Sequence, residues 1–263
     1  MGGTHIAMQN DSVPIFFINN NNPASYTNVR LTTAELGANF TRLTLSSTAT
    51  KKTVSNASLA YVSMAFPIKK WWGSSIGLIP FSSVGYQVSD QQNIANVGTV
   101  NFLYEGNGGI NQVYFGNGFK PFYGLPHMFS KSKRYQRLKA EKKDAAIYHI
   151  LKRKKALQGL SLGANASYLF GDFENTRKSI FSASSYAFNT STGTTTLASG
   201  FYFDYGMQYA LTIDSVRHRD LKDNVKIVFG ANFSTQTNLS AKIDSLSYSY
   251  FNNSLGNEVV KDT

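Results

Sequence analysis

Long runs of strictly alternating side chains are the feature that most constrains the fold of this chain. From Phe201 to Ile213 the odd positions are apolar or aromatic, whereas the even positions are mostly polar or small. Because successive side chains of a β-strand point to opposite faces, this pattern predicts a strand with one apolar and one polar face. Its length fits the roughly 9–11 residues that a tilted strand needs to cross a membrane, whereas strands of soluble proteins average about five or six.

A short repeat marks three strands of this kind. Gly-Ala-Asn, followed by Phe-Thr, Ala-Ser or Phe-Ser, occurs at 37–41, 163–167 and 230–234, with its polar and small residues on one parity. The repeat therefore predicts that Asn39, Asn165 and Asn232 point to one polar face. Together with weaker alternations, it predicts seven strands, near residues 30–45, 56–66, 74–88, 100–119, 160–168, 201–213 and 225–234.

Composition favours a membrane barrel over a soluble sheet protein. Hydrophobic residues make up 42% of the 263 residues, and the 19 Phe and 15 Tyr suit the aromatic girdles of an outer-membrane barrel. No uninterrupted run of 18 apolar residues occurs, which excludes a transmembrane helix. We therefore predict an all-β, antiparallel transmembrane β-barrel in a Gram-negative outer membrane. The alternative from the same pattern is a large soluble β-sandwich or a lipocalin-like barrel.

The same residues argue against catalysis. The chain has no Cys, which excludes disulfides and Cys-based zinc sites, and its four His residues lack metal-ligand spacing. No positioned nucleophile is evident, so we expect no enzymatic activity, no cofactor and no metal.

Charged and polar residues on the repeat's parity are expected to face the barrel interior. A charge on the lipid face costs about 2–4 kcal/mol near the midplane, so inward placement is expected whatever the function. Such residues either fill and hydrate the lumen or contact a substrate, and the three Asn residues could form a polar ladder that seats a plug. The predicted lumen-lining residues are Glu35, Asn39, Asn165, Asp204, Lys226 and Asn232.

One segment carries most of the positive charge. Residues 131–155 hold eleven Lys and Arg against two acids, which is +9 of the formal +11 of the chain. A patchy helical stripe without Gly or Pro predicts a basic helical insertion over 126–158, on the periplasmic side. The insertion is either a solvated, partly ordered basic segment, or a surface that binds anionic headgroups or an acidic periplasmic protein. Binding to nucleic acid is not expected. The basic partner surface predicted from it comprises Lys139, Lys142, Lys143, Lys152, Arg153, Lys154 and Lys155.

The two ends lead us to expect an incomplete reading frame. The first residues lack the basic and apolar regions of a signal peptide, and the last seven residues do not complete a strand. Seven strands is also an odd number, whereas single-chain bacterial barrels have an even one.

Several short motifs carry a resemblance to a known family. These are Gly2-Gly3, the stretch Asn22-Pro23-Ala24-Ser25, the turn Phe66-Pro67-Ile68-Lys69, Phe119-Lys120-Pro121, and the strand Ser75–Phe81 with Pro80. On these residues the chain resembles the FadL/TodX type of outer-membrane transport barrel. The resemblance covers the chain outside about 126–158.

The resemblance implies a fourteen-stranded barrel, of which residues 30–263 would form about half, with residues 1–29 as an N-terminal plug. Gly2, Gly3, Asn22, Pro23 and Ala24 would belong to the plug. The implied function is passive uptake of long-chain fatty acids or other hydrophobic small molecules across the membrane lipid, through a lateral opening at a kinked third strand. Proline breaks strand pairing, so Pro80 is the candidate for that opening, or else a harmless bulge.

A second function fits the same architecture. The chain could be a plugged, non-conducting barrel that serves as a scaffold or subunit in outer-membrane secretion or assembly. The basic insertion favours this alternative, because a transporter needs no such arm.

Overall fold

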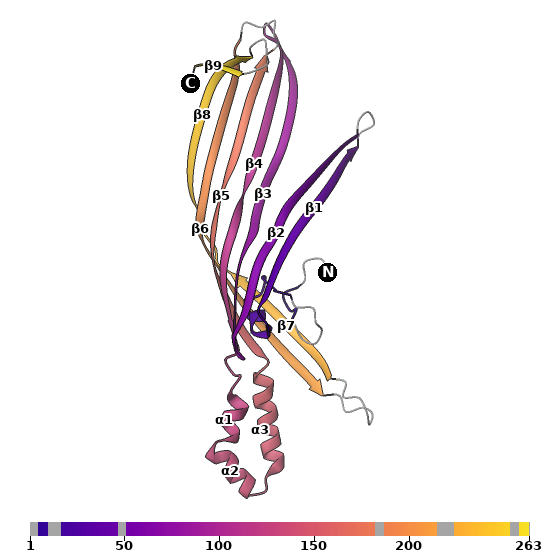
Figure 1. The fold of residues 1–263 in the computed structure, drawn as a ribbon, viewed down its shortest axis with the longest axis vertical. Coiled ribbons are helices and arrows are strands. Elements are labelled where there is room, and N and C mark those ends of the chain that lie inside the picture. The colour runs from indigo at the N-terminus through magenta and orange to yellow at the C-terminus, as the bar shows by residue number, and fades with distance from the viewer. Residues whose placement is uncertain are drawn as a thin grey trace. The chain divides into compact units, whose positions relative to one another are not determined.

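The chain forms one antiparallel sheet of nine strands in a computed structural model that describes residues 5–9, 17–46, 51–181, 187–214, 224–252 and 258–262 (Figure 1). Gly2 and Gly3 of the expected plug motif lie outside the described residues. The strands are β1 (Thr33–Ser46), β2 (Lys51–Lys69), β3 (Trp72–Ile94), β4 (Gly98–Phe119), β5 (Leu160–Phe181), β6 (Asn189–Asp214), β7 (Asn224–Ser234), β8 (Ser240–Asn252) and β9 (Glu258–Asp262).

The predicted all-β antiparallel class is confirmed, but the sheet does not close. In the sheet, strands β1 to β6 are neighbours in the order in which they occur in the sequence. Among the described residues, β1 pairs with β2 and with no other strand. A closed barrel would need the first and last strands to pair. Barrel closure and the count of fourteen strands therefore stay predictions.

Strands β7 and β8 share one neighbour. The C-terminal half of β6 pairs with β7 from Asp204↔Ser234 to Asp214↔Asn224, and its N-terminal half pairs with β8 from Asn189↔Tyr250 to Ser199↔Ser240. Residues 235–239 interrupt what is otherwise one long partner of β6. The sequence pattern predicted β7 but not β8. The apolar residues of β8 fall on both odd and even positions, so they give no clean alternation.

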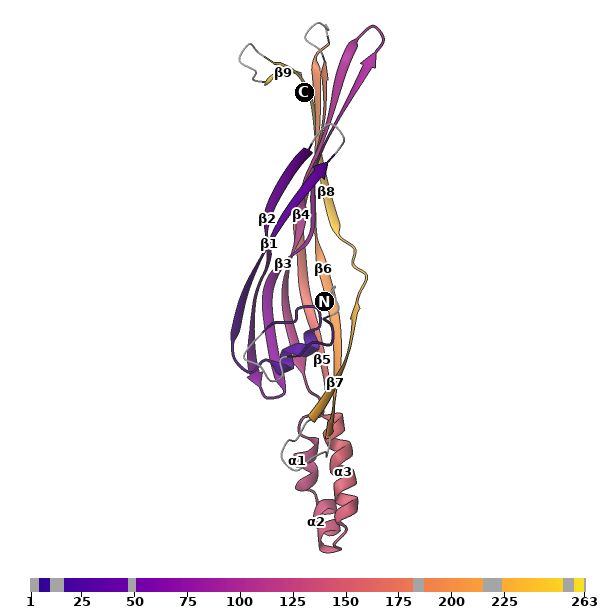
Figure 2. The same cartoon turned by 90° about the vertical axis from the view of Figure 1, so that its right-hand side faces the viewer.

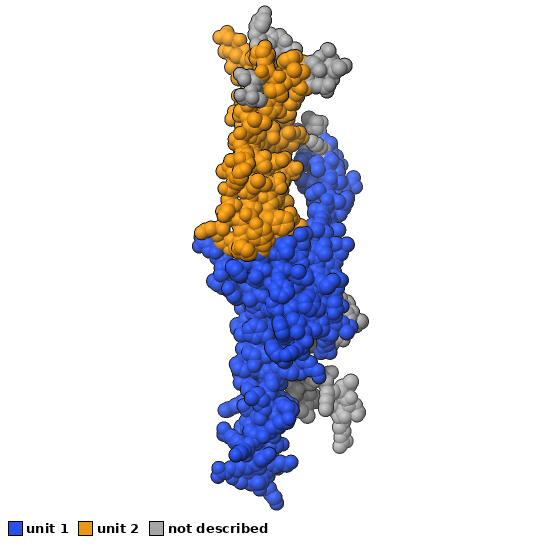
Figure 3. Space-filling view, turned by 60° about the vertical axis from the view of Figure 1, so that its left-hand side comes forward, with its two compact units in different colours: residues 1–78, 113–167, 202–236 blue, residues 79–112, 168–201, 237–263 orange. Residues whose placement is uncertain are grey.

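The chain divides into two compact units (Figure 3). Unit 1 comprises residues 1–78, 113–167 and 202–236, and unit 2 comprises residues 79–112, 168–201 and 237–263. Unit 1 thus holds β1, β2, β7, the N-terminal segment and all helices, while β3 to β6 contribute to both units.

Three helices stand between β4 and β5, where a helical insertion was expected: α1 (Leu125–Ser130), α2 (Lys133–Ala140) and α3 (Asp144–Leu157). The Ser132 hydroxyl caps α2 by accepting a bond from the Tyr135 backbone N–H. Phe129 and Ile147 are buried, and the Phe129 and Tyr135 rings meet edge to face with centroids 5.7 Å apart. In the described part of the chain, no helix has the length and apolarity to span a membrane.

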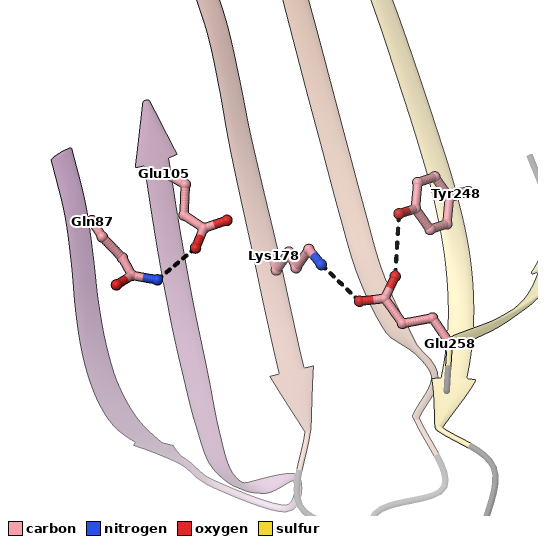
Figure 4. Close-up of polar contacts among 5 residues, drawn as sticks. All are labelled: Gln87, Glu105, Lys178, Tyr248 and Glu258. Carbon is pink, nitrogen blue, oxygen red and sulfur yellow. Dashed lines mark hydrogen bonds and ion pairs between the residues drawn. The ribbon is translucent and has the colours of Figure 1, made fainter. Parts of the chain in front are cut away.

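Unit 2 contains its own polar contacts (Figure 4). The Lys178 Nζ lies 2.7 Å from a carboxylate oxygen of Glu258, whose other oxygen accepts a 3.4 Å bond from the Tyr248 hydroxyl. Gln87 donates to the Glu105 carboxylate at 2.6 Å. The ion pair connects the short strand β9 to β5. The expectations of seven strands and of no strand in the last seven residues are therefore wrong, because β8 and β9 follow β7.

Candidate functional site: the strand face beneath the N-terminal segment

The N-terminal segment lies against the strands of unit 1 (Figure 2). Its described parts are residues 5–9 and 17–29, including the 3-10 helix η1 (Pro23–Asn28). The Asn22 side chain caps η1 by accepting a bond from the Ala24 backbone N–H, and Pro23 supplies a preset φ at the first helical position. All but the last residue of η1 are buried, so the helix packs closely against the strand face beneath it.

Asn22 connects the segment to two strands. Its side-chain N–H₂ donates to the carbonyls of Ile6 at 2.9 Å, Met207 at 3.1 Å and Ala231 at 3.4 Å. Met207 lies in β6 and Ala231 in β7, so one fully buried amide joins two parts of the N-terminal segment to both strands. A buried amide with this many partners specifies one docked position, because any shift leaves polar groups unpaired.

Two copies of the Gly-Ala-Asn repeat contact the segment. Asn165 in β5 donates to the Asn20 carbonyl at 3.4 Å, and Asn232 in β7 donates to the Asn21 carbonyl at 3.2 Å. The Asn39 side chain in the first copy is exposed. The second and third copies therefore bind the N-terminal backbone, whereas the first lies on a strand region that the segment does not cover.

Glycines of the repeat parity let the segment approach the strands. A Cβ on Gly206 would meet Asn22 Oδ1 and the Pro23 ring, and a Cβ on Gly163 would meet the Pro23 and Ala24 backbone. A Cβ on Gly230 would lie 2.6 Å from the Ile6 carbonyl oxygen. Only glycine leaves room for a second backbone at such a distance.

Further polar groups complete the contact on β1, β2 and β4. The Glu35 carboxylate accepts a 2.8 Å bond from the Ile18 backbone N–H, and Asn20 donates to the Ser63 hydroxyl at 3.1 Å. The buried Tyr114 hydroxyl donates to Asn20 Oδ1 at 2.6 Å. Strands β1, β2, β4, β5, β6 and β7 thus each contribute to the face that contacts the segment.

The opposite face of unit 1 is apolar and exposed. Along β6 the odd positions from Phe203 to Leu211 are exposed or half-buried, whereas Gly206 and Gln208 on the even parity are buried. A hollow on this face is lined largely by apolar side chains of β1 to β4. Leu36, at 75% exposure, and Phe233, at 67%, show how little protein covers it. An exposed apolar surface of this extent marks contact with a membrane or a partner.

The remaining predicted residues have mixed placements. Asp204 accepts bonds from the Ser234 hydroxyl at 3.1 Å and from Asn165 at 3.5 Å, while Lys226 is half-buried in β7. Pro80 is exposed in β3, two residues beyond Leu78, where the register between β2 and β3 ends. The luminal and lateral-opening roles stay predictions.

The predicted basic surface lies on the helices, outside the strand face. Lys139, Lys142, Lys143, Lys152, Arg153 and Lys155 are exposed, whereas Lys154 is half-buried with its ammonium 5.5 Å from the centre of the Phe129 ring. Glu141 bonds Lys143 at 2.8 Å and Arg137 at 3.1 Å. Hydrogen bonds from Lys143 and Arg137 hold the pKa of Glu141 below its ordinary value.

Sequence reasoning missed Gly206, Gln208, Ser63 and Tyr114. Gln208 is fully buried and donates to the carbonyls of Ile6 at 2.8 Å and Met8 at 3.2 Å. Gly206 and Gln208 share the parity of Asp204, so the alternation itself carried a signal for them. No such signal existed for the partners within residues 5–9. Among the described residues, no group of three or more acidic or His side chains could hold a metal ion.

Comparison with known proteins corrects the family expected from the short motifs. The family model BamG, which is related to the BAM complex, matches residues 1–127 and 153–263. Nothing in the comparisons indicates FadL/TodX, so that resemblance is wrong. Motifs such as Phe-Pro-x-Lys and Asn-Pro-Ala are short enough to occur in unrelated proteins. No curated protein and no solved structure matches the chain.

Proposed function

We propose that this chain, which belongs to the BamG family, is a plugged outer-membrane barrel subunit that acts in outer-membrane assembly. The family is linked to the assembly machinery of the Gram-negative outer membrane, and this supports the scaffold alternative over the uptake of hydrophobic molecules.

The observation that carries the proposal is the fit between the N-terminal segment and the polar strand face. Asn22, Asn165, Asn232 and Gln208 each donate a side-chain hydrogen bond to a backbone carbonyl of the segment or of the strands that it contacts. The donors of this face already bond groups within the chain, and the N-terminal segment fills the space above its glycines. Such a face offers no open path for cargo. The segment therefore serves as a fixed filling of the interior.

The apolar face supports membrane insertion. Strands such as β6, with 26 residues, exceed what a tilted strand needs to cross the hydrocarbon layer. Tyr205 and Phe233 stack on this face across β6 and β7 with centroids 6.5 Å apart. Exposed aromatic and aliphatic side chains on one face and hydrogen-bonded polar side chains on the other are the arrangement of a barrel wall.

Depletion of the protein in its host tests this proposal. We expect newly made outer-membrane proteins to accumulate in their unfolded form, measured by their shifted migration on unheated gels, while uptake of a labelled fatty acid stays unchanged. The control is restoration by a plasmid copy of the full chain. Normal assembly of other barrels together with a loss of fatty-acid uptake would contradict the proposal.

A further inference from the structure

We propose that helices α1 to α3 and the adjacent turn between β2 and β3 form a binding surface for anionic phospholipid headgroups. The family match leaves residues 128–152 uncovered, so α2 and parts of α1 and α3 lie outside the matched residues, whereas the turn between β2 and β3 lies inside them. The inference rests on the proposed membrane location but is independent of the role in assembly.

The first support is uncompensated charge. Of the eleven Lys and Arg in 131–155, Arg137 and Lys143 share Glu141, and Lys154 lies over the Phe129 ring. The other eight are exposed, and the described residues give none of them an acidic partner within 4 Å; they are Lys131, Lys133, Arg134, Lys139, Lys142, Lys152, Arg153 and Lys155. Such a cluster attracts phosphate groups, each of which accepts several charge-assisted hydrogen bonds.

The second support is the aromatic turn beside the helices. The Trp71 carbonyl accepts a 2.8 Å bond from the Lys120 backbone N–H, just before α1 begins, so the turn and the helices lie at one end of unit 1. Trp71 and Trp72 stack with centroids 6.1 Å apart, and the Lys69 ammonium lies 5.4 Å from the Trp71 ring centre. Lys70 is exposed on the same turn.

Indoles beside lysines at the end of an apolar strand wall are typical of the headgroup level of a membrane. The apolar face continues to this end, since Ile68 at 40% and Phe119 at 41% are exposed next to the turn. On the helices, Met128 at 68% and Tyr148 at 62% add apolar side chains among the charges. An acidic protein would account for the charges, but a lipid surface accounts for the charges, the indoles and the exposed apolar side chains together.

Lipid titration of the purified full chain tests the proposal. The chain contains only two tryptophans, Trp71 and Trp72, so its indole fluorescence reports on this surface alone. The chain in a non-ionic detergent is titrated with short-chain phosphatidylglycerol or, separately, phosphatidylcholine, and indole fluorescence gives each affinity. We expect the anionic lipid to bind at least about tenfold more tightly, with the difference shrinking at high salt.

Matched variants assign the effect to the helices. K152Q/R153Q should weaken phosphatidylglycerol binding by roughly 25-fold, at about fivefold for each basic residue. R42Q/K51Q removes the same charges from exposed positions in β1 and β2 and should leave the affinity unchanged. K152R/R153K keeps the charge and should bind like the original chain. Circular dichroism checks that each variant folds, and the salt dependence of the unmodified chain tests the proposal if one does not.

Three outcomes would overturn the inference. Equal affinity for the two lipids would remove the headgroup preference. Displacement of the lipid by inorganic phosphate at similar concentrations would make the site one for free anions. Tighter binding of a polyglutamate peptide than of phosphatidylglycerol would favour an acidic protein partner. None of these outcomes bears on the depletion experiment, so the headgroup surface and the assembly function can fail separately.

Discussion

The two polar surfaces of unit 1 use opposite chemistry. The strand face beneath the N-terminal segment is largely buried, and its amides, hydroxyls, glycines and the Glu35 carboxylate contact a second backbone. The helical surface is exposed and carries mostly cations with few partners. Buried polar groups must be satisfied inside the chain, whereas exposed charges can be left for an outside partner. The difference indicates that the first surface positions a part of this chain and that the second binds something else.

The substitution with the largest expected effect introduces a side chain at a glycine beneath the N-terminal segment. In Gly206→Val the new side chain meets Asn22 and Pro23, and we expect the free energy of unfolding to fall by about 3 kcal/mol. Chemical denaturation followed by circular dichroism measures this. Gly193→Val, on the same strand, is the matched control because no atom lies within 4 Å of its Cβ position. Equal stability of the two variants would argue against a seated segment.

The repeat copies provide a finer comparison. Asn165→Ala removes the donors to the Asn20 carbonyl and to Asp204, so we expect a loss of about 1–2 kcal/mol in the free energy of unfolding. Asn39→Ala changes an exposed residue, and its effect should stay within about 0.5 kcal/mol. If both substitutions cost the same, the three copies would have one shared role and the comparison would fail.

Neutralising the helical surface should leave the sheet intact. We expect a chain with Gln at Lys139, Lys142, Lys143 and 152–155 to reach the membrane fraction in the usual amount, because these side chains do not contact the strand face. Fractionation and immunoblotting measure this. Loss of the variant from the membrane fraction would show that the helices are needed for insertion.

The smallest expected effect concerns Glu141. Its pKa is lowered by Lys143 and Arg137, so its ion pairs contribute to stability above the ordinary carboxyl pKa and are lost as the pH falls through the lowered value. A carboxyl NMR titration of the full chain should place its midpoint below the ordinary value, and K143Q should raise it. An unchanged midpoint in K143Q would show that Lys143 does not lower the pKa of Glu141.

Much of the fold could be predicted from side-chain parity, and less of the site. The alternation in 201–213 located β6 because one face is apolar and the other is not, whereas β8 escaped because Leu246, Ile243 and the tyrosines fall on both parities. The two-residue alternation of side chains in a strand was enough to place Asn165 and Asn232 on one polar face. Their partners Asn20 and Asn21 could not be foreseen, since contacts between residues over 140 positions apart leave no local pattern.

The family could not be predicted from short motifs. Gly-Gly and Asn-Pro-Ala stretches follow from turn and cap chemistry, as the cap of η1 by Asn22 illustrates. They recur wherever that chemistry is needed, and they led to a transport family that the BamG match overturns. The stretch Phe66-Pro67-Ile68-Lys69, which was expected to be a turn, instead ends strand β2.

Cysteine reactivity tests the central claim most directly, that the N-terminal segment stays seated on the strand face. The chain has no Cys, so a single thiol can be placed at Ser25, which is 7% exposed, or at the exposed Lys139. In the membrane-inserted chain we expect a maleimide to label S25C at least about a hundredfold more slowly than K139C, because labelling of S25C requires local opening. Equal labelling rates would contradict the account.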